Sequence, residues 1–313
     1  MNRAKLAAAL LAAVFTTLSV TGVAKAGSAR EEMIDQGSWN ASKKFVHLGN
    51  GLRVAYVETG NPAGKPLLLL HGFTDTSRSW SLAVPHLAKY RLLIPDLRGH
   101  GATDAPECCY GPVQLADDAR LFLDAVAVEK AAVAGHSGGS MAAMALAAEH
   151  PGRVTHLVLV GSTGLAPLQR GDWLIDNVER MTFPIDRNSQ FMRDWHPANQ
   201  PNPIDPAFAA AAMEEILAVK PHVWRGFLRE LVGLPVARHA ADVKAKVLIL
   251  SGEKDPLFPV KHHAALVTAF PGAQAHIFAG LGHNLNWERP AQVAATIDAF
   301  VSSASSVATT SRQ

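Results

Sequence analysis

Short, continuous apolar runs alternate along most of the chain with longer stretches that predict helices, and such runs fit strands buried on both faces. The expected strands cover residues 44–47, 52–59, 67–70, 92–95, 131–134, 154–161, 247–250 and 276–279, and Asn50-Gly51 predicts a hairpin turn between the first two. Helices are expected over residues 79–89, 113–128, 138–150, 260–269 and 290–302. The alternation predicts an α/β fold with a mostly parallel eight-stranded sheet that helices cover on both faces.

The alternation breaks between residues 162 and 241, an interval long enough for an inserted helical cap between core parts 44–161 and 242–302. It is rich in large apolar side chains, most of which we expect to form the cap's own small core. A lid over an active site must also contribute a wall, so some of them should line an apolar pocket. The candidate pocket residues are His136, Trp173, Phe183, Trp195 and Trp224.

The two ends of the chain differ from its body. Residues 1–26 have the form of a signal peptide, with basic Arg3 and Lys5, an apolar stretch, and the small-x-small sequence Ala24-Lys25-Ala26. We expect cleavage there and export to the periplasm or the medium, with no stable membrane anchor; an uncleaved anchor is the alternative. Residues 27–43 are expected to be an extended leader and residues 303–313 a flexible tail.

Charge and composition narrow the choice of partners. Loss of residues 1–26 removes Arg3, Lys5 and Lys25, so the formal charge changes from +2 to 26 minus 27, or −1. The basic residues are dispersed, which excludes an electrostatic grip on nucleic acid. His262, His263 and His276 are scattered, and we expect no metal and no cofactor. The oligomeric state stays open, and adjacent Cys108 and Cys109 are either a strained vicinal disulfide or two non-catalytic thiols.

Gly135-His136-Ser137-Gly138-Gly139 lies between an expected strand and an expected helix. A serine at such a sharp turn is held in a strained conformation with its hydroxyl clear of the chain, and small neighbours supply the room. By itself the motif is equally consistent with a helix N-cap. A second motif favours catalysis: the apolar run at 67–70 leads into His71-Gly72-Phe73. Acyl transfer needs two amide donors for the oxyanion, and Phe73 and Gly138 occupy the positions that provide them.

Two residues far downstream complete the chemistry. Asp255 and His283 each follow an expected strand. A serine hydroxyl needs an imidazole to accept its proton and a carboxylate to orient that imidazole. The order serine, acid, histidine therefore predicts the triad Ser137, Asp255 and His283, with Glu253 as the nearest substitute for the acid.

These motifs, together with Asp96-Leu97-Arg98-Gly99-His100-Gly101, resemble those of α/β-hydrolase fold enzymes over residues 44–302. The resemblance implies that Ser137 is the nucleophile, His283 the general base and acid, and Asp255 its orienter. It implies structural roles for Arg98 and His100. One departure is Gly138, where relatives often carry Met or Gln, and we expect extra space beside the nucleophile there.

The resemblance predicts a serine hydrolase of the carboxylesterase type that acts on small or medium acyl esters. A serine nucleophile excludes epoxide hydrolases and haloalkane dehalogenases of this fold, which use aspartate. Lactonase and amidase activity remain alternatives, as do perhydrolysis and the hydrolysis of carbon–carbon bonds with the same triad. From a different class of function, the chain could be a non-catalytic binding protein for a small apolar ligand.

Overall fold

The computed structural model describes residues 34–195 and 200–303. The expected signal peptide, the start of the leader, and residues 304–313 lie outside this part of the chain.

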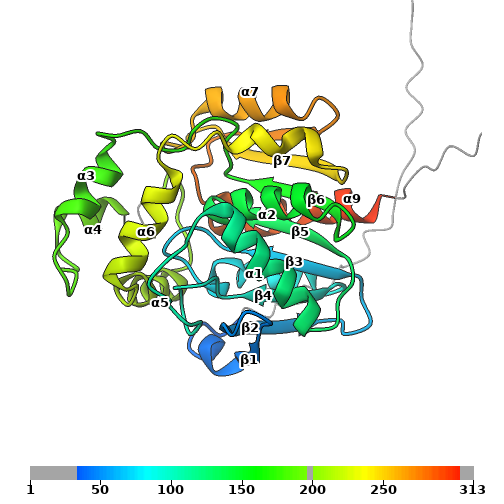
Figure 1. The fold of residues 1–313 in the computed structure, drawn as a ribbon, viewed down its shortest axis with the longest axis horizontal. Coiled ribbons are helices and arrows are strands. Elements are labelled where there is room, and N and C mark those ends of the chain that lie inside the picture. Colours follow the sequence, from blue (N-terminus) through cyan, green and yellow to red (C-terminus); the bar gives the residue numbers. More distant parts are fainter. Residues whose placement is uncertain (1–33, 196–199, 304–313) are drawn as a thin grey trace, which may run out of the picture. The chain divides into compact units, whose positions relative to one another are not determined.

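An eight-stranded sheet forms the centre, with strands β1 (Lys44–His47), β2 (Arg53–Gly60), β3 (Pro66–Leu70), β4 (Arg91–Pro95), β5 (Ala131–His136), β6 (Val154–Val160), β7 (Lys246–Gly252) and β8 (Gln274–Phe278) (Figure 1). Their order is β1-β2-β4-β3-β5-β6-β7-β8. β1 and β2 pair antiparallel, as do β2 and β4, and the other pairs are parallel. The predicted fold class is confirmed.

The central strands are apolar on both sides because both faces of the sheet are covered. Leu68 and Leu70 of β3 face a core shared with α1 (Pro112–Ala125), α2 (Gly138–Glu149) and α7 (Val260–Ala269). Leu67 and Leu69 face a second core with α9 (Pro290–Ser302) and the short helix α8 (Leu285–Glu288). All four leucines are fully buried, and each such burial is worth about 1.5–3 kcal/mol.

The expected helix over residues 79–89 is not continuous. It consists of two 3-10 turns, η2 (Ser77–Trp80) and η3 (Val84–Leu87). Pro85 at the start of η3 has no N–H to donate, which prevents an α-helical bond from that residue. Residues 35–42 likewise form a turn and the 3-10 helix η1 (Trp39–Ser42) where we expected an extended leader. Trp39 is buried there, and its Nε1 donates to Ser77 Oγ at 3.2 Å.

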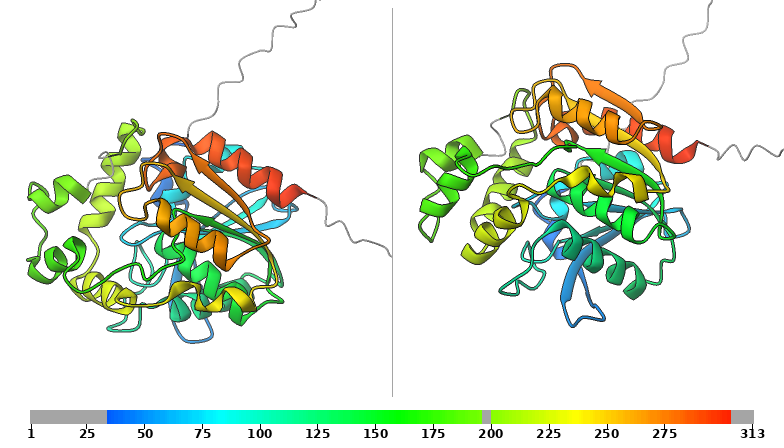
Figure 2. Two further views of the ribbon diagram at one scale, coloured as in Figure 1. Left: turned by 90° about the horizontal axis from the view of Figure 1, so that it is seen from above. Right: turned by 45° about the horizontal axis from the view of Figure 1, so that its top comes forward.

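Between β6 and β7 the chain forms α3 (Trp173–Arg180), α4 (Gln190–Trp195), α5 (Pro206–Leu217), α6 (Pro221–Leu231) and the 3-10 helix η4 (Val236–Asp242). We call residues 162–241 the insert. Its helices α3 to α6 lie together at one side of the sheet in all views (Figures 1 and 2). α5 is joined to the core by Glu215, which receives hydrogen bonds from Asn40, Thr76 and Arg78. None of the helices in the described part of the chain is long and apolar enough to span a bilayer.

Candidate active site

Ser137 forms the sharp turn between β5 and α2. Its φ of 51° and ψ of −121° are unusual for a residue with a side chain, and such strain costs on the order of 1–3 kcal/mol. The turn is held by a hydrogen bond from Ser137 N to Val160 O at 2.9 Å. It also needs Gly139, because a Cβ at that position would lie 2.3 Å from His71 O. The strained turn that the sequence around Ser137 predicts is therefore present in the structure.

Asp255 and His283 are paired on neighbouring loops, after β7 and β8. His283 Nδ1 lies 2.8 Å from Asp255 Oδ2, and Asp255 Oδ1 accepts from Leu257 N and Phe258 N, each at 2.8 Å. Both side chains are buried. Burial raises the pKa of Asp255, but the charge and hydrogen bond of His283 and the two amides outweigh it, so the pKa lies below its usual value. The carboxylate therefore stays ionised and fixes the imidazole with its proton on Nδ1.

His136 places the His283 loop beside the turn of Ser137. The Nε2 atom of His136 lies 3.1 Å from His283 O, and the rings of the two histidines are 5.1 Å apart. His283 Nε2 is buried and has no hydrogen-bond partner, so the Ser137 hydroxyl is not bonded to it in this structure. Contacts of this kind often tighten only when substrate binds. His136 was a candidate pocket residue, but the structure places it among the catalytic loops, with Nδ1 3.7 Å from Asp75 Oδ2.

The two predicted oxyanion donors are brought together. A Cβ built on Gly138 would lie 3.5 Å from Phe73 N, so the start of α2 faces the loop after β3. Neither the Phe73 nor the Gly138 amide donates to an acceptor in the described part of the chain. Two such amides beside Ser137 are what an oxyanion developing there would require.

Two neutral histidines hold residues 71–76 after β3, which we call the oxyanion loop because they include the candidate donor Phe73. His100 Nε2 accepts from Thr74 N at 3.2 Å, and its Nδ1 is 2.9 Å from Arg98 O. Burial and the nearby His71 lower the pKa of His100 to about 3, and burial also lowers the pKa of His71. His71 in turn accepts from Leu97 N at 2.8 Å. The structural role expected for His100 is therefore to position Thr74, the residue that follows Phe73.

Aromatic side chains of the insert cover Phe73. The Phe227 ring stacks on it at 4.6 Å, and Trp224 and Trp195 approach its ring at 5.1 and 6.2 Å. Trp195 Nε1 also donates to Thr74 Oγ1 at 3.0 Å. Of the predicted pocket residues, Trp195 and Trp224 thus adjoin the oxyanion loop. Trp173 is 45% exposed, and the ring of Phe183 lies 5.4 Å from the guanidinium of Arg225.

Phe227 was absent from the candidate site residues, and it corrects the expectation for Gly138. A Cβ on Gly138 would lie 2.6 Å from Phe227 Cζ. The room left by the missing side chain is therefore filled by a ring from α6, and the expected extra space is not present. The apolar positions of α6 indicate a buried face, but the sequence holds no signal that this face meets residue 138.

Several other polar residues considered in the sequence have partners away from Ser137 and His283, or are exposed. Glu253 accepts from Gly280 N at 2.8 Å, whereas Asp255 is the carboxylate bonded to His283. Arg98 binds Asp118, with Nη2 2.9 Å from Oδ1. Cys108 and Cys109 are free and exposed thiols. The described residues contain no group of His, Cys, Asp and Glu side chains suited to a metal ion.

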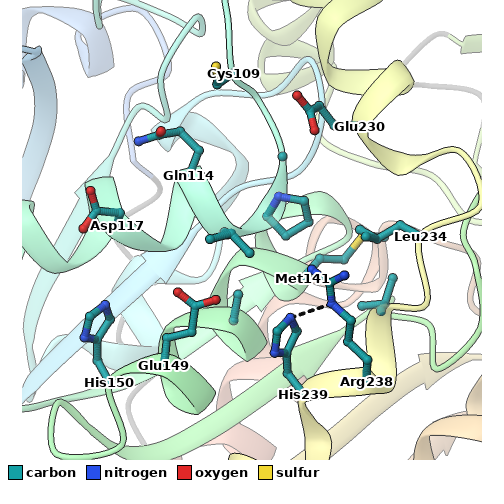
Figure 3. A pocket seen from close by; sticks show the side chains of 15 residues that line it. Cys109, Gln114, Asp117, Met141, Glu149, His150, Glu230, Leu234, Arg238 and His239 are labelled. Carbon is teal, nitrogen blue, oxygen red and sulfur yellow. Dashed lines mark hydrogen bonds between the residues drawn. The ribbon is translucent and has the colours of Figure 1, made fainter.

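A surface cavity of about 550 Å³ lies between α1, α2 and residues 234–239 (Figure 3). Its wall combines acidic Asp117, Glu149 and Glu230 with Arg238, which donates to His239 at 2.8 Å. The triad does not line it. Met141, one turn after Ser137 on α2, is the wall residue nearest in sequence to the nucleophile.

Comparison with known proteins identifies the family. The model of the alpha/beta hydrolase family matches residues 67–296, well over half of the chain, and the protein belongs to this family. It is 29% identical over 290 residues to a 2-hydroxymuconate semialdehyde hydrolase of Pseudomonas sp. (strain CF600), covering 86% of this chain and 99% of the relative. The protein is accordingly a hydrolase, and a small-molecule substrate is consistent with its relatives.

Solved structures agree with this assignment. An esterase from Rhodococcus sp. ECU1013 superposes with a TM-score of 0.65 at 27% identity, over 84% of this chain and 99% of the esterase. An enol-lactonase from Burkholderia xenovorans LB400 superposes with a TM-score of 0.70 over 83% of this chain and all of that one. At 20% identity the second likeness shows the fold alone.

Proposed function

We propose that the protein is an exported serine hydrolase that cleaves carboxylic esters of small to medium acyl chain through an acyl-enzyme on Ser137. One arrangement carries the proposal. Ser137 occupies a strained turn beside the amides of Phe73 and Gly138, which lack an acceptor, and the neighbouring loop carries a buried imidazole bonded to Asp255. That combination is suited to nucleophilic attack on a carbonyl group.

The steps follow from the positions of these groups. Ser137 Oγ attacks the ester carbonyl, and its proton passes to His283 Nε2, the nitrogen without a partner. The carbonyl oxygen becomes an oxyanion between the amides of Phe73 and Gly138. His283 then protonates the departing alkoxide, which leaves the acyl group on Ser137. Water, deprotonated by the same imidazole, releases the acid and restores the enzyme.

We propose that the insert acts as a lid and that its aromatic residues form the acyl pocket. Trp224 and Phe227 are almost fully buried, and both rings contact the buried ring of Phe73. We infer that an acyl chain enters by displacing part of this aromatic group. Short chains need the smallest displacement, and each added methylene gains about 0.8 kcal/mol of burial until the space is filled.

The same triad also supports neighbouring reactions. Lactones and amides present the same carbonyl chemistry, and hydrolysis of carbon–carbon bonds uses the same three residues. The similarity to a 2-hydroxymuconate semialdehyde hydrolase favours a semialdehyde of that type as the second candidate substrate. Matched linear esters, cyclic esters, anilides and this semialdehyde, compared by kcat/KM, separate the possibilities.

Export is proposed from residues 1–26. Cleavage after Ala26 would leave Gly27 as the first residue of the mature protein. Expression of the full chain with fractionation into cytoplasm, periplasm and medium, followed by intact mass, tests this. An unprocessed cytoplasmic product would contradict export without affecting the proposed chemistry.

The decisive experiment treats the purified protein with a fluorophosphonate, locates the label by peptide mass mapping, and measures hydrolysis of p-nitrophenyl esters from C2 to C6. We expect labelling at Ser137 and turnover that depends on acyl length. Ser137→Ala should lose both and keep its fold by circular dichroism, whereas Ser38→Ala, at an exposed serine, should keep both. A folded protein that is neither labelled nor active would favour the non-catalytic binding protein.

A further inference from the structure

Residues 200–205 of the insert lead into α5 and contact the loop that carries His283. Asn202 makes the contact: its Nδ2 donates to Gly280 O at 2.8 Å and to Glu288 Oε2 at 2.7 Å. Gly280 lies three positions before the catalytic histidine. A side chain of the insert is therefore bonded directly to the backbone of the catalytic loop.

Glu288 extends this contact to the residue next to His283. Its side chain is buried, and Oε1 accepts from Gly282 N at 2.8 Å. Asn202 and Glu288 together bind Gly280 O and Gly282 N, on the two sides of Leu281. The backbone that enters His283 is thus held at two points by one bonded pair of side chains.

Two further contacts restrict the pair. Arg289 Nη2 donates to Asn202 Oδ1 at 3.2 Å, which orients the amide so that its NH₂ group faces Gly280 and Glu288. Pro201 lies against the loop, because a Cβ on Gly282 would be 2.7 Å from Pro201 Cδ. The loop cannot move toward the insert without a clash, and moving away would break the Asn202 bonds.

We propose that Asn202 is a positioning residue through which the insert holds the His283 loop in its catalytic position. The other hydrogen bonds of this loop come from the core: Asp255 at His283 Nδ1, His136 at His283 O, Lys254 N at Leu281 O, and Glu253 Oε2 at Gly280 N. Asn202 therefore links the alignment of the base to the position of the insert. Misplacement of a catalytic group by about 1 Å costs on the order of 100-fold in rate. The inference rests on the proposed function of His283 as the base.

The test compares Asn202→Ala with Asn188→Ala, at an exposed asparagine of the same insert. For Asn202→Ala we expect kcat on a short p-nitrophenyl ester to fall about 10- to 100-fold, with KM within about twofold because the acyl pocket is untouched. The rate of Ser137 phosphonylation by a fluorophosphonate should fall in parallel. The low-field proton resonance of His283 Nδ1–H, assigned by its loss in His283→Ala, should broaden or shift. Asn188→Ala should match the wild type in all of these.

Wild-type kcat and an unchanged Nδ1–H resonance in Asn202→Ala would overturn the proposal. Should that variant fail to fold, Arg289→Ala provides the test. Arg289 is exposed, and its replacement removes the hydrogen bond that orients the Asn202 amide. A several-fold loss of kcat at constant KM would support the proposal, and no change would overturn it. Absence of labelling in the wild type would instead refute the esterase function, and the Nδ1–H resonance would still report whether Asn202 positions the loop.

Discussion

The ring of Phe227 on α6 occupies the place that a side chain at residue 138 would need, with Cζ 2.6 Å from the position of its Cβ. A residue with a side chain at position 138, directly after Ser137, would therefore clash with a ring from the insert. The same ring stacks on Phe73. One aromatic side chain therefore contacts both segments that carry the proposed oxyanion amides.

Gly138→Ala should disturb this packing, because Phe227 is almost fully buried and has little freedom to retreat. We expect a loss of about 1–3 kcal/mol in the free energy of unfolding and a lower kcat. Phe227→Leu provides room, so the double variant should be more stable than the sum of the single effects predicts. Urea unfolding and kcat of all four proteins form a double-mutant cycle, and strictly additive effects would contradict the contact.

Asp255→Asn should keep the fold and lower kcat by about 10³- to 10⁴-fold, because an amide no longer fixes the tautomer of His283 or stabilises its charged form. Glu253→Gln is the matched control. Its oxygen can still accept from Gly280 N, and it does not contact His283. We expect it to remain within about twofold of the wild type. A large loss in Glu253→Gln with little loss in Asp255→Asn would reverse the assignment of the acid.

The burial of neutral His100 predicts a pH-dependent stability. Its pKa is about 3 in the folded protein against 6.5 as the reference value, so the unfolded chain takes up the proton first as the pH falls. The contribution of the neutral imidazole is complete above pH 6.5 and is lost progressively from there toward pH 3. His100→Gln keeps an acceptor for Thr74 N and should flatten the fall in unfolding free energy between pH 7 and 4. His47→Gln, on exposed β1, should leave the fall unchanged; an equally steep fall in His100→Gln would rule out His100 as its source.

Trp195→Phe keeps the aromatic ring and removes the hydrogen bond to Thr74 Oγ1. A bond of this type is worth about 0.5–1.5 kcal/mol, so we expect kcat/KM to fall about 2- to 10-fold through a looser oxyanion loop. Trp39→Phe also removes one bond from an indole to a hydroxyl, at Ser77, and should affect thermal stability with little change in kcat/KM. Equal kinetic effects in the two variants would show that the Thr74 contact has no special role.

Much of the fold could be predicted from local signals. The runs at 67–70 and 131–134 form strands because a sheet covered on both faces requires apolar residues on each side. Ser137 could be identified because small residues around a serine between a strand and a helix suit a strained turn. The helix expected at 79–89 was wrong because Pro85 interrupts it, which a period-based reading underestimates.

The sequence by itself determined the strands of the core, most of its helices, their order and the residue types of the proposed triad, because these depend on periodicity and on chemistry that few side chains can perform. Only the tertiary structure decided which side chains meet across the insert. Asp255 and not Glu253 is bonded to His283. The ring of Phe227 fills the space at Gly138. Asn202 donates to the loop that carries His283. These contacts join residues far apart in the chain, and their geometry depends on how the insert packs on the core, which no local pattern encodes.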